Sequence, residues 1–275
     1  MAKEYVAVKT VEEALAAKKS GGVFLAGGTE INRLDSSVEA DKLISIRHIK
    51  ELAAICEADD SICIGAMCTF QQVVESDQVP DWMKEACLFM ASRTKRNMAT
   101  ISGNIAVRRT DSYLAATLLA VQAKIKLAGG ETVDYLDYIG GSGCGDAQGT
   151  CPYADALIEA LIIPKDMAFV ESGRTANTAQ SHAALTVAFA AKEKLDDVSM
   201  GAAVKNGGIY YLSDLMAAIR EDHDISEEKL IDMVLTCEGA KFPTDMFGSE
   251  KYKRYLLGVT VSNLLRDAKV KGGLS

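Results

Sequence analysis

The stretch Leu25-Ala26-Gly27-Gly28-Thr29-Glu30 ends a short apolar run, residues 23–26, with two consecutive glycines. The run is too short for a helix and predicts a buried strand. The glycines let the backbone curl so that successive N–H groups face one concavity, which can hold phosphate oxygens without a lysine. A strand followed by Gly-Gly-Thr can equally be a simple tight turn with a helix cap, so this interpretation depends on the rest of the chain.

A second stretch, Ala99-Thr100-Ile101-Ser102-Gly103-Asn104-Ile105, follows the basic segment Arg93-Thr94-Lys95-Arg96. It places the hydrogen-bonding side chains of Thr100, Ser102 and Asn104 around one glycine, which suits the phosphates or ribose of an anionic ligand. The alternative is a loop whose polar side chains satisfy its own backbone. Neither stretch is a G-x-G-x-x-G or Walker A motif.

Apolar periodicity and capping residues predict alternating short strands and helices in the first part of the chain. Capping boxes are predicted at Thr10 and Thr69, each followed three residues later by Glu or Gln, and Asp81 is predicted to be an N-cap. Further strands are predicted at residues 43–46, 62–64, 124–127 and 157–163, and helices at residues 70–74, 82–90 and 113–122, the last apolar on nearly every face.

The segment Pro164-Lys165-Asp166 is the clearest linker-like break in the sequence. It predicts one domain at residues 1–164 and a second at residues 165–275. The second part is predicted to contain a helix at about residues 178–192, a hairpin turning at Asn206-Gly207 and three more helices, one starting at Ser226 and the last at Ser249.

The composition is that of an ordinary globular protein, with 48% hydrophobic and 25% charged residues. The formal net charge of -8 argues against nucleic acid as a partner, because an acidic surface repels phosphate backbones. The sequence contains no apolar segment long enough to span a membrane and no signal-peptide pattern at residues 1–5. The expected location is therefore the cytoplasm.

The cysteines and histidines give no clear chemical site. The seven cysteines include no C-x-x-C pair, and only Cys144 and Cys151, beside the glycines of residues 140–145, form a pair to consider for metal. Those glycines are interpreted as a flexible loop because no helical pattern follows them. The three histidines, His48, His182 and His223, stand isolated in the sequence and are interpreted as surface or structural residues. No catalytic acid, base or nucleophile is assigned.

Together, the two glycine-containing stretches resemble the paired FAD motifs of the flavin subunits of molybdenum hydroxylases, which include xanthine, carbon monoxide and nicotinate dehydrogenases. Residues 26–30 match A-G-G-T-[DE], and residues 100–104 match T-[IL]-G-G-N. Further along, residues 157–164 resemble the family's E-L-I-x-x-I-x-I-P strand, and residues 248–254 resemble G-S-x-x-Y-[RK]-R. The resemblance covers nearly the whole chain in order, so it is more specific than either motif alone.

The resemblance implies an α+β fold: a PCMH-type FAD-binding domain at residues 1–164, with subdomains at about 1–52 and 53–164, and a C-terminal α+β domain with a small antiparallel sheet and helices at residues 165–275. FAD would bind between the two subdomains, with both motifs closing on the pyrophosphate. The implied cofactor-binding residues are Leu25, Ala26, Gly27, Gly28, Thr29, Glu30, Ala99, Thr100, Ser102, Gly103, Asn104 and Ile158.

Three departures from the family pattern stand out. Ser102 replaces a glycine of the second motif. The family's S-P-x-x-D-L is replaced by residues 108–114, which place Tyr113 at the aspartate position and displace Asp111 by two residues. The two basic residues of that segment, Arg108 and Arg109, could offset pyrophosphate charge or bind an acidic partner surface, and both roles stay open. Glu171 stands near the position where some members have a lysine before the arginine that matches Arg174.

The resemblance implies a cofactor-binding electron-transfer subunit of a xanthine-dehydrogenase-like complex. Electrons would pass from a 2Fe-2S ferredoxin-like partner through FAD to NAD⁺ or another acceptor, while a large subunit with the molybdenum cofactor hydroxylates a purine or other N-heterocycle. One alternative is a free-standing flavin oxidase, for which residues 165–275 offer little room. Another is a non-catalytic scaffold with degenerate FAD motifs, which the departures at Ser102 and Tyr113 allow.

Overall fold

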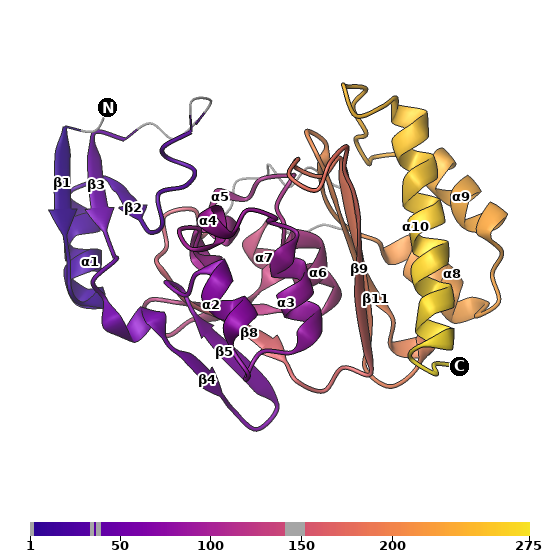
Figure 1. Cartoon of the computed structure of the whole chain (residues 1–275), viewed down its shortest axis with the longest axis horizontal. Helices are drawn as coiled ribbons and strands as arrows, with labels where there is room; N and C mark the ends of the chain where they lie inside the picture. The colour runs from indigo at the N-terminus through magenta and orange to yellow at the C-terminus, as the bar shows by residue number, and fades with distance from the viewer. Residues whose placement is uncertain (1–2, 34–35, 37–39, 141–151) are drawn as a thin grey trace.

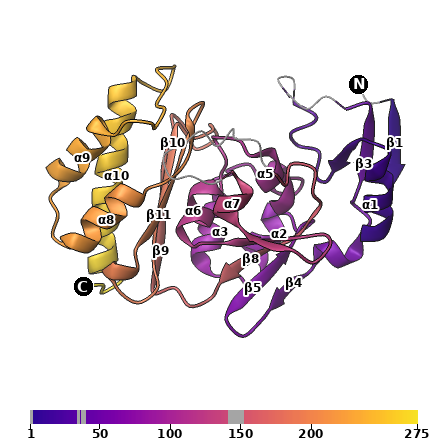
Figure 2. The same ribbon diagram turned by 180° about the vertical axis from the view of Figure 1, so that it is seen from behind.

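The computed structural model describes residues 3–33, 36, 40–140 and 152–275, which form three sheets with helices between and beside them (Figure 1). The predicted mixed α+β fold is confirmed. The first sheet lies at one end of the molecule, the second in the middle, and the third, with the last helices, at the other end. The reverse view in Figure 2 shows the same order.

The first sheet is parallel, with strand order β1-β3-β2. Its strands are β1 (Glu4–Ala7), β2 (Val23–Leu25) and β3 (Lys42–Ser45), and helix α1 (Val11–Lys19) joins the first two. Thr10 caps α1, since its Oγ1 accepts the N–H of Glu13 at 3.1 Å. The predicted capping box is wrong in one detail: the Glu13 carboxylate accepts from the N–H of Lys9 at 2.7 Å, one residue before the cap.

The second sheet is antiparallel, with strand order β4-β5-β8-β6-β7. Its central strand, β8, is the last of the five in sequence and pairs with both β5 and β6, so it joins the earlier segments of this sheet. The strands are β4 (Ile55–Glu57), β5 (Ser61–Gly65), β6 (Lys124–Leu127), β7 (Thr132–Asp134) and β8 (Ile158–Pro164).

Short helices surround this second sheet. They are η1 (Lys50–Ala53), α2 (Phe70–Glu75), α3 (Asp81–Leu88), α4 (Arg93–Arg96), α5 (Ile101–Val107), α6 (Ala115–Ala120) and α7 (Tyr135–Tyr138). The capping box at Thr69 is confirmed. The N-cap at Asp81 is wrong: Pro80 is the cap, since proline tolerates a helix start, and Asp81 lies in the first turn, where its charge suits the helix dipole.

The third sheet is antiparallel, with strand order β12-β11-β10-β9. Its strands are β9 (Phe169–Thr175), β10 (Leu185–Ala191), β11 (Ser199–Val204) and β12 (Gly208–Tyr211), with η2 (Leu195–Asp197) before β11. The predicted hairpin at Asn206-Gly207 is confirmed, with Asn206 at φ +59. Helices α8 (Ser213–Glu221), α9 (Glu227–Thr236) and α10 (Glu250–Val270) cover its outer side (Figure 1).

The helix predicted at residues 178–192 is wrong, because residues 185–191 form strand β10. All seven residues of β10 are buried, between α6 on one face of the sheet and α10 on the other. A strand buried on both faces loses its polar alternation, and a run rich in alanine then resembles a helix. Helix α6 is itself buried throughout, as its apolar sequence predicted.

The buried hydrophobic side chains of the described residues form two clusters. One spans the first two sheets and includes Ala188 and Ala203 of the third, while the other lies between the third sheet and α8–α10. The third sheet is thus packed on both faces, and a boundary near Pro164 stays a prediction. No helix among the described residues is long and apolar enough to cross a membrane. The predicted loop and the pair Cys144 and Cys151 fall in residues 141–151, outside the described residues.

Candidate cofactor-binding site

The first glycine turn, residues 27–30, has an unusual backbone conformation and hydrogen bonding. Gly28 has φ +72, a left-handed conformation that glycine adopts readily, and its carbonyl accepts from the backbone of Asn32 at 3.2 Å and from its side chain at 2.9 Å. Within the described residues, the N–H groups of Gly27, Gly28, Thr29 and Glu30 donate to no protein acceptor. This run of backbone donors is therefore available to an anionic ligand.

The second motif begins a helix and is not the loop that was considered as an alternative. Thr100 is the N-cap of α5, and its Oγ1 accepts the N–H of Gly103 at 3.1 Å. The N–H groups of Ile101, Ser102 and Asn104 donate to Cys68, Ala66 and Thr100 at 2.9, 3.2 and 3.1 Å. The expectation that both motifs close on the pyrophosphate is therefore corrected in one respect: the N–H groups of residues 101–104 are bonded within the chain, so these residues can contribute only side chains.

Gly27 brings the two motifs into contact. A Cβ atom at Gly27 would lie 1.9 Å from the carbonyl oxygen of Met98, immediately before the second motif. No side chain fits at that distance, so glycine is required for the close approach of the two backbones. The two motifs predicted to act together are thus adjacent in the structure.

A cleft of about 1000 Å³, including its open mouth, lies between the two motifs. Its lining includes all but two of the predicted cofactor-binding residues: Leu25, Ala26, Gly27, Gly28, Thr29, Glu30, Thr100, Ser102, Gly103 and Ile158. Ser102 is only 5% exposed, so it lies in the wall of the cleft and does not block it. We call this the first cavity.

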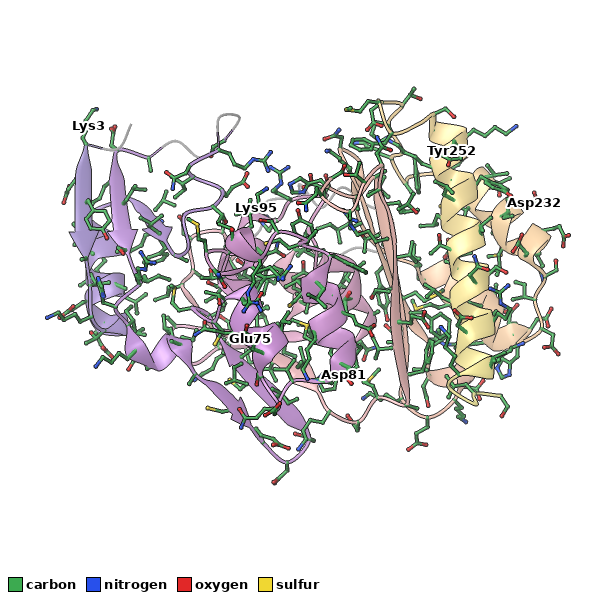
Figure 3. All side chains as sticks on the ribbon, in the orientation of Figure 1. Lys3, Glu75, Asp81, Lys95, Asp232 and Tyr252 are labelled. Atoms are coloured by element: carbon green, nitrogen blue, oxygen red, sulfur yellow. The ribbon has the colours of Figure 1, made fainter. Side chains whose placement is uncertain are left out.

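A second cavity, of about 930 Å³ with its mouth, adjoins the first at Thr29, Glu30, Gly103 and Val107. The two remaining predicted residues, Ala99 and Asn104, line it. So do side chains that the sequence did not assign to a site: Arg33, Lys95, Arg109, Asp111, Tyr113 and His182. In Figure 3, Lys95 is labelled in the upper part of the central region, and the labels of Glu75 and Asp81 lie below it.

Buried charges connect the wall of the second cavity. Arg109 donates two hydrogen bonds to Asp111, at 2.7 and 2.9 Å, and one to Glu30 at 2.9 Å. Two roles were left open for Arg109, offsetting pyrophosphate charge and binding an acidic partner surface. Neither is needed to explain its position, because its charge is paired within the chain. The neighbouring Arg108 has φ +49 and a buried Nη1 without a partner among the described residues.

His182, which stands alone in the sequence, has close neighbours in the structure. Its Nδ1 lies 3.4 Å from Oδ2 of Asp111, and its ring centroid lies 5.2 Å from that of Tyr113. Burial lowers the pKa of His182, and the positive charges of Arg109, Lys205 and Lys95 act in the same direction, although Asp111 opposes them. Burial raises the pKa of Asp111, but the Arg109 hydrogen bond and the nearby positive charges prevail, so it lies below its ordinary value. Asp111 is therefore ionised at neutral pH.

The residues that line the two cavities fit the diphosphate of a dinucleotide. Free N–H groups at residues 27–30 point to an anionic ligand, and Ser102 and Asn104 add side-chain donors. Glu30 would repel phosphate, but Arg109 at 2.9 Å and Arg33 at 3.5 Å offset its charge. Two adjoining cavities give room for an elongated dinucleotide.

The fold and this site are those of a dinucleotide-binding protein. Residues 1–166 match the family described as FAD binding domain in molybdopterin dehydrogenase, and the chain belongs to this family. The resemblance to flavin subunits of molybdenum hydroxylases is thereby confirmed. The chain is also 31% identical over 278 residues to the uncharacterised protein YgfM of Escherichia coli strain K12, covering 99% of this chain and 98% of YgfM.

Solved structures share the fold. A carbon monoxide dehydrogenase from Hydrogenophaga pseudoflava that lacks the Mo-pyranopterin moiety matches with a TM-score of 0.83 and 21% identity, over 97% of this chain and 96% of that chain. Quinoline 2-oxidoreductase from Pseudomonas putida 86 matches with a TM-score of 0.81 and 18% identity, over 99% and 98% of the two chains. At these identities the likeness shows the fold alone.

Replacing Asn104 by alanine is expected to weaken FAD binding by about 1–3 kcal/mol. The Oδ1 of Asn104 accepts from Ser112 at 2.7 Å, which leaves its NH₂ group as the donor for a ligand. Titration calorimetry of the full chain with FAD would measure the change. Ser112→Ala is the matched control: it removes the partner of Asn104 and leaves the NH₂ group. Equal affinity in Asn104→Ala and the wild type would remove Asn104 from the site.

Proposed function

We propose that this chain is the FAD-binding electron-transfer subunit of a molybdenum hydroxylase complex. In this complex a 2Fe-2S ferredoxin-like subunit would deliver electrons, and a large subunit with the molybdenum cofactor would hydroxylate an N-heterocycle such as a purine. The electrons would pass from FAD to NAD⁺ or another acceptor. The family match and the likeness to two molybdenum-enzyme structures support this assignment.

The observation that carries the proposal is the contact of the two glycine motifs at a cleft with free backbone donors. The N–H groups of residues 27–30 would bind the FAD diphosphate, and Ser102 and Asn104 would add hydrogen bonds. Ile158, at the start of β8, lies in the wall of the first cavity and would contact the adenosine half.

The second cavity would then hold the flavin half. Tyr113 and His182 would form an aromatic wall there, and Arg33 and Lys95 a basic one. A bound flavin can accept electrons singly from a cluster and release them in pairs to a hydride acceptor. The chain itself would position the ring between these two walls.

The full chain, expressed alone and freed of loose nucleotide, is expected to show the visible absorbance of a flavin and to release FAD on denaturation. A colourless chain that does not bind added FAD would contradict the proposal and favour a scaffold with degenerate motifs. Purification of the chain from its native cells tests the electron-transfer role. A 2Fe-2S ferredoxin-like subunit and a large molybdenum subunit should purify with it. Turnover of a substrate with oxygen by the chain alone would instead indicate a free-standing oxidase.

A further inference from the structure

Charged side chains from four separate segments meet around Asp111. Its carboxylate is only 3% exposed and lies 2.7 Å from Nε of Arg109, 3.4 Å from Nδ1 of His182 and 3.9 Å from Nζ of Lys205. Arg109 also binds Glu30 of the first glycine turn at 2.9 Å. We call these five residues the Asp111 cluster.

The Asp111 cluster joins the glycine turn to the third sheet. His182 lies in the connection between β9 and β10, and Lys205 directly follows β11. Next to these ion pairs, the N–H of Asn206 donates to Oγ1 of Thr110 at 2.9 Å, and the rings of Tyr113 and His182 are in contact. The loop of residues 108–113 therefore contacts the cofactor turn on one side and the third sheet on the other.

Asp111 is the residue on which this arrangement depends. Arg109, His182 and Lys205 carry or can carry positive charge, and Asp111 is the carboxylate that all three share. Without that charge Arg109 and Lys205 would repel each other, His182 would lose its carboxylate neighbour, and Arg109 would lose two of its three hydrogen bonds. Arg109 would then keep only its hydrogen bond to Glu30, and nothing in the cluster would tie the glycine turn to His182 and Lys205.

We propose that Asp111 is a positioning residue that couples occupancy of the glycine turn to the docking of the third sheet against the second cavity. A ligand on residues 27–30 fixes Glu30, Glu30 fixes Arg109, and Asp111 transmits this constraint to His182 and Lys205. Because coupling between two sites is reciprocal, docking of the third sheet also strengthens binding at the turn. This inference rests on the proposed function, since FAD is the ligand that occupies the turn.

Hydrogen exchange of the full chain with and without FAD tests this coupling. In the wild type, FAD is expected to slow exchange at residues 27–30 and also, by about 5- to 150-fold, at residues 176–184 and 204–208. In Asp111→Asn, FAD should still slow exchange at residues 27–30 but no longer in the two distant segments. FAD affinity should fall by a factor in the same range, because the coupling is mutual.

Two further variants keep the test decisive. Glu171→Gln is the control: it removes an ion pair between Glu171, on β9 of the third sheet, and Lys271, at the end of α10. It should leave the distant protection unchanged. Glu30→Gln removes the charge that pairs with Arg109 at the turn while Asp111 keeps its other partners. Measured with FAD at saturation, so that residues 27–30 are still protected, it should also abolish the distant protection, which decides the matter if Asp111→Asn does not fold. Distant protection that persists in either Asp111→Asn or Glu30→Gln overturns the coupling. A wild-type chain that binds no FAD overturns the proposed function instead.

Discussion

Replacing Gly27 by alanine is expected to lower the affinity for FAD by about 100-fold or more, equivalent to about 2.8 kcal/mol. The new Cβ would lie 1.9 Å from the carbonyl oxygen of Met98. Backbone cannot yield as a flexible side chain can, so the first turn must move away from the second motif. The free N–H groups of residues 27–30 would then no longer face the same cleft as Ser102 and Asn104. Fluorescence titration with FAD measures the loss.

Gly129→Ala is the matched control for this substitution. Gly129 has φ +104, but a Cβ there meets nothing within 4 Å. It should therefore reduce stability slightly, by about 1 kcal/mol, and leave FAD affinity unchanged. If Gly27→Ala binds FAD as tightly as the wild type, contact between the two motifs is not needed for the site.

Replacing Lys253 by methionine is expected to reduce the free energy of unfolding by about 3–5 kcal/mol. Lys253 is fully buried in α10, where its Nζ donates to Pro243 at 2.6 Å and to Asp245 at 2.7 Å. Methionine fills similar space but leaves the mostly buried carboxylate of Asp245 unpaired. Urea denaturation followed by circular dichroism would give the difference.

Lys251→Met, on the exposed side of the same helix, is the control and should change stability by about 0.5 kcal/mol or less.

The pH dependence of the loss in stability gives a second check. Burial raises the pKa of Asp245, but the Lys253 hydrogen bond and the N–H of Phe247 prevail and hold it below its ordinary value. A lowered carboxyl pKa stabilises the fold above about pH 4 and less below it, so the Lys253→Met deficit should shrink in acid. A deficit independent of pH would assign the loss to packing.

For the motif at residues 248–254, the sequence showed the pattern and the structure shows what its residues do. The G-S-x-x-Y-[RK]-R resemblance identified residues 248–254 as a family feature, and Ser249 caps α10 as predicted. The structure adds that Arg254 donates to the carbonyls of Val234, Cys237 and Ala240, and that its guanidinium lies 4.8 Å from the ring centroid of Phe242. The basic pair at residues 253–254 therefore fastens the segment between α9 and α10 to the last helix.

The sequence by itself determined the two glycine motifs, most strands and caps of the first part and the family, because glycine conformation, capping and apolar alternation act over a few neighbouring residues. It misassigned β10, whose burial on both faces comes from α6 and α10 and leaves no trace in the local pattern. Only the tertiary structure decided that Gly27 touches Met98 and that Arg109 and His182 meet at Asp111. Steric contact and ion pairing depend on distances between atoms far apart in the chain, which local preferences do not fix.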